Sequence, residues 1–166
     1  MPMRLMKMVD SRMDIIVDGG IEADFTPPAG IEAAVTAACS VAGFDTPPML
    51  CIRFAGDAEV RELNSQWRGL DCVTDVLSFP MQDDSDAIDP NQSLGDIALA
   101  VPFVLDEAQR LELPQADHIV HLIVHATLHL LGYDHIDDEE AAQMQQLERQ
   151  AMQQLGLHDP YPELSQ

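Results

Sequence analysis

The stretch HATLHLLGYDH, at positions 125–135, constrains this chain more than any other part of its sequence. It places His125, His129 and His135 in the spacing H-x3-H-x2-G-x2-H. Residues i and i+4 of a helix lie about 5–6 Å apart on one face, so the first two imidazoles can bind one ion. Gly132 permits a left-handed turn that brings the third histidine back toward the helix end. The spacing therefore predicts a metal site with these three histidines as ligands.

The predicted site leaves one metal position open. Three protein ligands are typical of catalytic zinc, whereas structural zinc sites have four. Zinc proteases with this histidine spacing carry a glutamate after the first histidine as general base, and this chain has Ala126 there. We therefore expect activation of water or polarisation of a substrate oxygen, as at a phosphodiester, rather than peptide cleavage. Asp134 and Tyr133 are candidates for the proton-transfer group, and Asp134 can equally anchor a ligand histidine.

Two further histidines, His118 and His121, lie on the same helical stripe as the predicted ligands. A stripe with a period of 3.6 residues brings them one and two turns before His125. Because they precede the turn that gathers the three ligands, we interpret them as hydrogen-bond partners of the site or as core residues.

The hydrophobic pattern predicts an α+β fold, with a mixed sheet of about four strands and about five helices packed on it. The expected strands are 13–17, 50–55, 74–80 and 94–100. The expected helices are 29–43, 57–69, 102–113, 115–131 and 137–156. A chain of 166 residues is long enough for one domain with a real core, so we expect a single metal-dependent hydrolase domain over 1–166.

The net charge of −21 argues against general nucleic-acid binding, because phosphate affinity comes from lysine and arginine. However, three of the eight basic residues, Arg53, Arg61 and Arg68, lie close together in the sequence and could form a local basic patch. Arg68 follows Trp67 at the end of an expected helix. Its planar guanidinium can bind a phosphate through two hydrogen bonds, and an exposed helix-terminal arginine explains its position equally well.

The sequence allows more than one role for several residues near this arginine. The strand 74–80 has three polar members, Thr74, Asp75 and Ser78, which can support a site or simply lie on an edge strand. Three aromatic residues could stack on nucleobases: Trp67, Phe79 and Tyr133. We interpret the aromatic residues as core residues, which is the more common role of such side chains.

Two long blocks of the chain resemble the bacterial YbeY family. HATLHLLGYDH resembles the signature H-G-x-L-H-L-x-G-Y-D-H, and LNSQWRGLDCVTDVLSFP (63–80) resembles the block L-N-x-x-[YW]-R-G…T-D-V-L-S-F-P. LGDIALA (94–100) is similar to the family's L-G-D-I strand. The resemblance runs from about residue 50 to 156 in consistent order. The chain departs from the pattern at Ala126, where the family usually has glycine.

The resemblance implies a mixed sheet flanked by helices, distantly like that of zinc proteases. It also implies a zinc-dependent endoribonuclease that cuts single-stranded RNA. The implied role is maturation of the 3′ end of 16S ribosomal RNA and quality control of the small subunit. One Zn²⁺ per chain would be held by His125, His129 and His135, with His125 and Arg68 as catalytic residues and Arg68 in the active-site cleft. The implied partners are ribosomal RNA and the small ribosomal subunit with its assembly factors, and neither DNA nor a membrane.

Two other functions fit the sequence. One is a zinc hydrolase of small molecules or peptides. The other is a non-catalytic ribosome-assembly factor with a structural metal, which the charge of −21 favours because acidic proteins can dock on basic ribosomal proteins.

The sequence predicts a cytoplasmic location. The N-terminal MPMRLMKMVD lacks the continuous apolar stretch of a secretory signal, and no apolar run reaches the roughly 20 residues of a membrane span. Cys39, Cys51 and Cys72 are odd in number, without C-x-x-C spacing, and are expected to be reduced and buried.

Overall fold

A computed structural model describes residues 4–7, 13–22, 24–45, 48–82 and 88–162 of the chain. Its strands are β1 (Arg4–Lys7), β2 (Met13–Val17), β3 (Met49–Ala55), β4 (Val76–Pro80) and β5 (Ser93–Ala100). Its helices are α1 (Ile31–Val41), α2 (Asp57–Arg68), α3 (Val101–Arg110), α4 (Gln115–Leu130) and α5 (Asp138–Gln154). The predicted α+β class is confirmed.

The strands form one mixed sheet in the order β1-β2-β3-β5-β4. The three central strands run parallel, and β1 and β4 pair antiparallel at the two edges. The sequence predicted about four strands, and the additional one is β1. Its four residues, RLMK, are too few to show the alternation that reveals a strand.

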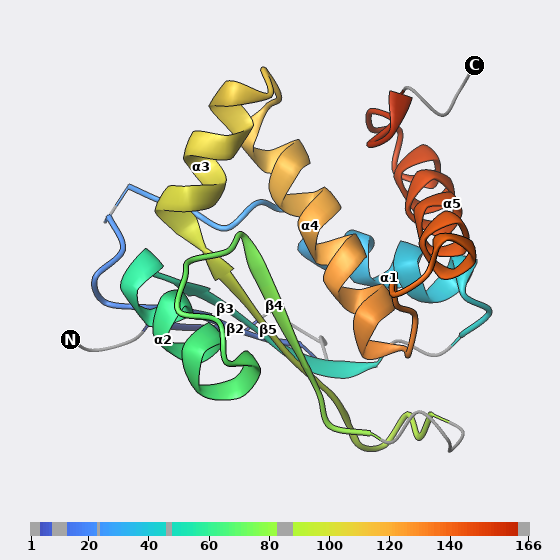
Figure 1. Cartoon of the computed structure of the whole chain (residues 1–166), viewed down its shortest axis with the longest axis horizontal. Helices are drawn as coiled ribbons and strands as arrows, with labels where there is room; N and C mark the ends of the chain where they lie inside the picture. The colour runs from blue at the N-terminus through green and yellow to red at the C-terminus, as the bar shows by residue number, and fades with distance from the viewer. Residues whose placement is uncertain (1–3, 8–12, 23, 46–47, 83–87, 163–166) are drawn as a thin grey trace.

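One face of the sheet carries the main core. Ile52 and Phe54 of β3 and Ile97 and Leu99 of β5 are buried there, in one cluster with residues of α1, α4 and α5. Figure 1 shows α4, drawn in orange, running between the sheet and the red helix α5. Burying each such side chain contributes about 1.5–3 kcal/mol, so α4 is held firmly in place. It is the helix that carries the predicted metal ligands.

The opposite face of the sheet is covered at one end by α2. A small cluster of buried residues joins this helix to β3, β4 and β5: Ala55, Val60, Leu77 and Ala100. Away from α2, Cys51 and Arg53 of β3 and Asp96 of β5 remain partly exposed. The part of this face that carries these three residues is therefore not covered by α2.

Two expectations of burial were wrong in part. Cys39 is buried, but Cys51 is half-buried and Cys72 is exposed, because they lie on the open face and in the loop after α2. Trp67 is 70% exposed rather than in the core, although Tyr133 does pack against the main core. Among the described helices, none combines the length and apolar character that a bilayer span requires.

Candidate metal centre

The last turns of α4 place two imidazoles side by side. The Nε2 atoms of His125 and His129 lie 3.1 Å apart, close to the separation of about 3.3 Å expected for two nitrogens on one tetrahedral zinc. After α4 ends, Gly132 has a φ of 104°, a left-handed conformation that glycine adopts without strain. The turn brings His135 back, so that ligating atoms of all three histidines lie within 4.8 Å of one another. The cluster could therefore hold a metal ion.

The outer nitrogens of the two helical imidazoles are held by hydrogen-bond acceptors. Nδ1 of His129 donates to the backbone carbonyl of Tyr133 at 3.0 Å, and Nδ1 of His125 donates to Oε1 of Glu148 at 3.1 Å. With the proton on Nδ1, the lone pair of each Nε2 points into the cluster, which is the arrangement that metal ligands require.

Glu148 is a site residue that the sequence reasoning missed. It lies on α5, is 1% exposed, and also accepts hydrogen bonds from Nε2 of His121 at 2.8 Å and from the hydroxyl of Tyr161 at 2.9 Å. Burial raises the pKa of Glu148, but the hydrogen bonds from His121 and His125 outweigh it and lower that pKa to about 2. The residue is therefore a carboxylate that orients His125. The sequence did contain a signal for this role, because Glu148 interrupts the apolar stripe formed by Met144, Ala151 and Met152.

The two earlier histidines of α4 do not belong to the cluster. His121 supports it through Glu148, and Nε2 of His118 contacts Oε1 of Glu107 at 2.7 Å, further along the helix. Within the cluster, burial and then the charges of His125 and His135 lower the pKa of His129 to about 4. His129 is therefore neutral near pH 7, as a ligand must be.

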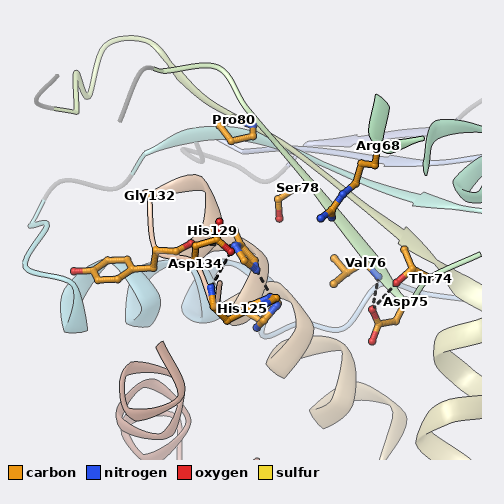
Figure 2. Close-up of a pocket in the computed structure, with 12 residues that line it drawn as sticks. Arg68, Thr74, Asp75, Val76, Ser78, Pro80, His125, His129, Gly132 and Asp134 are labelled. Carbon is orange, nitrogen blue, oxygen red and sulfur yellow. Dashed lines mark hydrogen bonds between the residues drawn. The ribbon is translucent and has the colours of Figure 1, made fainter. Parts of the chain in front are cut away.

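Residues distant in sequence join the three histidines around one pocket of about 420 Å³. Arg68 comes from the end of α2, and Thr74, Asp75 and Ser78 come from the edge strand β4 and the residues before it. Figure 2 shows Arg68 and Ser78 across the pocket from the imidazoles. The hydroxyl of Ser78 donates to the carbonyl of Ala126 at 3.2 Å, which ties β4 to α4.

The expected basic patch reduces to one arginine. Arg53 donates two hydrogen bonds to Asp18, at 2.9 and 2.8 Å, and Arg61 donates two to Asp71. Arg68 has no ion-pair partner among the residues that the structure describes. Its guanidinium is thus available to an anion in the pocket.

The groups considered for proton transfer have different surroundings. Oδ1 of Asp134 accepts a hydrogen bond from the backbone N–H of His135 at 2.8 Å, so it anchors the ligand loop. Asp75 also lines the pocket, and its Oδ1 accepts hydrogen bonds from the hydroxyl of Thr74 at 3.4 Å and from the backbone N–H of Val76 at 2.7 Å. Burial, opposed by the hydrogen bond from His118, raises the pKa of Glu107, and the charge of Asp75 adds to the shift. Ala126 is fully buried and does not line the pocket, so no base can act from position 126.

Comparisons with known proteins find relatives that cover most of the chain. A protein of Alkalilimnicola ehrlichii named Endoribonuclease YbeY is 43% identical over 139 residues, covering 84% of each chain. One of Rhizorhabdus wittichii with the same name is 52% identical over 116 residues, 66% of this chain and 69% of that one. The solution structure of TM1509 from Thermotoga maritima has the same fold, with a TM-score of 0.52 and 20% identity. The match covers 89% of this chain and 97% of that one. The family model described as Endoribonuclease YbeY matches residues 22–156, and the chain belongs to that family.

Proposed function

We propose that this chain is a zinc-dependent endoribonuclease that cuts single-stranded RNA in the pocket between α4 and β4. The observation that carries the proposal is the convergence of three imidazoles in one pocket with the guanidinium of Arg68, which has no ion-pair partner in the described part of the chain. Imidazoles supply the metal-binding atoms, and a guanidinium matches the oxygens of a phosphodiester. The family's name, Endoribonuclease YbeY, supports RNA as the polymer that is cut.

The proposed metal is one Zn²⁺ per chain. Three neutral imidazoles suit zinc, and they leave a coordination position for catalysis rather than closing a structural site. A bound zinc supplies Lewis-acid chemistry, by lowering the pKa of a coordinated water or polarising a substrate oxygen. Glu148 and the carbonyl of Tyr133 keep the two helical imidazoles oriented for this ion.

The remaining roles belong to side chains on the opposite wall of the pocket. Arg68 binds the scissile phosphate and stabilises the charge that grows on its oxygens during cleavage. Asp75 is a candidate to accept or return a proton, because it lines the pocket. We therefore propose Arg68, His125 and Asp75 as the residues on which turnover depends.

The biological substrate that we propose is ribosomal RNA, in maturation of the 16S 3′ end and quality control of the small subunit in the cytoplasm. This role rests on the resemblance of the two sequence blocks 63–80 and 125–135 to the YbeY pattern. A non-catalytic assembly factor is the second candidate. The charge of −21 favours it, because such a surface can dock on basic ribosomal proteins.

A cleavage assay tests the proposal. Purified protein is assayed on single-stranded RNA and on a 16S precursor, before and after chelation and after zinc is restored. We expect cleavage that chelation abolishes and zinc recovers, with no cleavage of an unstructured peptide such as casein. Intact RNA in the presence of stoichiometric zinc would instead support the assembly factor, and chelator-resistant cleavage would exclude the metal mechanism.

A further inference from the structure

A second cavity adjoins the metal pocket on the open face of the sheet. It is a groove of about 740 Å³ between α2 and the strands β3, β4 and β5. Its apolar wall contains Trp67 and Phe79, whose ring centroids lie 6.3 Å apart in an edge-to-face arrangement. Trp67 is 70% exposed and Met81, on the same wall, is 61% exposed. Apolar side chains that gather at an exposed groove are typical of a surface that binds a ligand.

The groove and the metal pocket share three residues. Arg68, Ser78 and Pro80 line both, so the two cavities meet across the edge strand β4. Arg68 extends toward Ser78 at this junction (Figure 2). A polymer with a phosphate at Arg68 would therefore place a neighbouring unit in the groove, beside Trp67.

The floor of the groove offers a hydrogen-bond acceptor. Asp96 lies opposite Phe79 in the β4–β5 ladder and lines the groove. Among the described residues its carboxyl group has no hydrogen-bond partner. The other charged group on the floor, Arg53, is already paired with Asp18. The acceptor of Asp96 is thus free for a donor on a ligand.

We propose that this groove binds a nucleobase of the RNA strand, one nucleotide away from the phosphate at Arg68. The base stacks on Trp67, and its exocyclic amino group donates to Asp96. The inference rests on the proposed function, since it takes RNA as the occupant. Aromatic stacking accepts any base, whereas the carboxylate selects adenine, cytosine or guanine over uracil, which has no amino group. The subsite therefore gives the nuclease a preference at a position next to the cut.

Trp67 is the one tryptophan of the chain, so its fluorescence reports on the groove directly. The full-length, metal-loaded protein is mixed by stopped flow with RNA hexamers of adenylate or uridylate and with an abasic hexamer. We expect adenylate to quench the fluorescence with saturation, and the abasic hexamer to bind at least about fivefold more weakly. No quenching by adenylate, or equal binding of the abasic strand, would overturn the stacking.

Substitutions at Trp67 and Asp96 test the two proposed contacts with the base separately. With a fluorescein-labelled adenylate hexamer, Trp67→Ala should raise the Kd at least about fivefold and Trp67→Phe should restore part of the affinity. Leu111→Ala removes another exposed side chain, outside the groove, and should leave the Kd unchanged. Asp96→Ala should abolish the preference for adenylate over uridylate. An unchanged Kd in Trp67→Ala would overturn the base subsite, and an undiminished preference in Asp96→Ala would overturn the role of the carboxylate.

Cleavage of the same hexamers is scored separately. Quenching without cleavage would count against the proposed nuclease and leave the base subsite standing. Cleavage without quenching would overturn the subsite alone.

Discussion

Oε1 of Glu148 accepts a hydrogen bond from Nδ1 of His125 at 3.1 Å, which joins α5 to a predicted metal ligand on α4. The same oxygen accepts from His121 at 2.8 Å, and the hydroxyl of Tyr161 closes the network from the chain beyond α5. A carboxylate in this position fixes the tautomer of the imidazole and makes it a better ligand. The predicted metal site thus depends on the docking of a helix that contributes none of the three predicted ligands.

Replacing Glu148 should weaken metal binding without removing a ligand. Glu148→Gln keeps the shape of the side chain but loses the charge that holds the Nδ1 proton of His125. We expect metal affinity to fall about 10- to 100-fold, measured by competition with a chelating dye. Tyr161→Phe removes one hydroxyl contact and keeps the carboxylate, so its loss should be smaller. Wild-type affinity in a folded Glu148→Gln protein would show that the contact does not act on the metal.

Metal removal should lower stability by an amount that depends on free zinc. A ligand that binds the folded state at 100 times its Kd adds about 2.7 kcal/mol to the free energy of unfolding. We therefore expect a chelator to lower the Tm of the wild type and to have no effect on His129→Ala, which should carry little zinc. Leu111→Ala, at an exposed position outside the cluster, is the control and should respond like the wild type. Stoichiometric zinc in His129→Ala by elemental analysis would refute the ligand assignment.

Loss of Arg68 should slow the chemical step. Removing one donor to developing charge typically costs about 10²–10³ in rate. Arg68→Lys keeps the charge but not the planar fork, so it should recover part of the activity. Arg61→Ala is the matched control, because this exposed arginine is paired with Asp71 and lies outside the pocket. The measurement is single-turnover RNA cleavage beside zinc content, and full activity of Arg68→Ala with zinc bound would remove the residue from the mechanism.

Gly95 should tolerate no side chain. Its φ is 150°, and a Cβ there would collide with the backbone carbonyl of Phe79 and approach Cδ2 of Leu130 to 2.8 Å. Gly95→Ala should therefore lower the free energy of unfolding by about 1–3 kcal/mol, measured by urea denaturation. Gly20→Ala is the control, since a Cβ at Gly20 meets nothing within 4 Å. Equal midpoints for the two variants would mean that β4 can shift away from β5 at no cost.

The three thiols should react with alkylating reagents in a fixed order. Cys72 is exposed and should be modified first. Burial raises the pKa of Cys51 to about 11 and that of Cys39 to about 12, which removes the reactive thiolate near neutral pH. Mass spectrometry over time should show Cys51 modified slowly and Cys39 only on unfolding. Early modification of Cys39 would indicate that α1 opens in the native protein.

The sequence was sufficient for features set by neighbouring residues. The helix 115–131, the glycine turn and the approach of His135 follow from a 3.6-residue period and the conformational freedom of Gly132, and α4 ends at Leu130, one residue before the expected end. The apolar strands and the α+β class followed from patterning in the same way. The short strand β1 was not predicted, because four residues are too few to show the alternation of a strand.

Contacts between elements were decided by the tertiary structure. Glu148 lies 23 residues from His125 and Ser78 lies 48 residues from Ala126, so no local period relates them. The docking of α2 at one end of the sheet leaves Trp67 exposed, although its spacing from Val60 and Leu63 places it on the apolar face of the helix. Periodicity tells which face of an element is apolar, but burial of each residue on that face depends on how far the partner element extends.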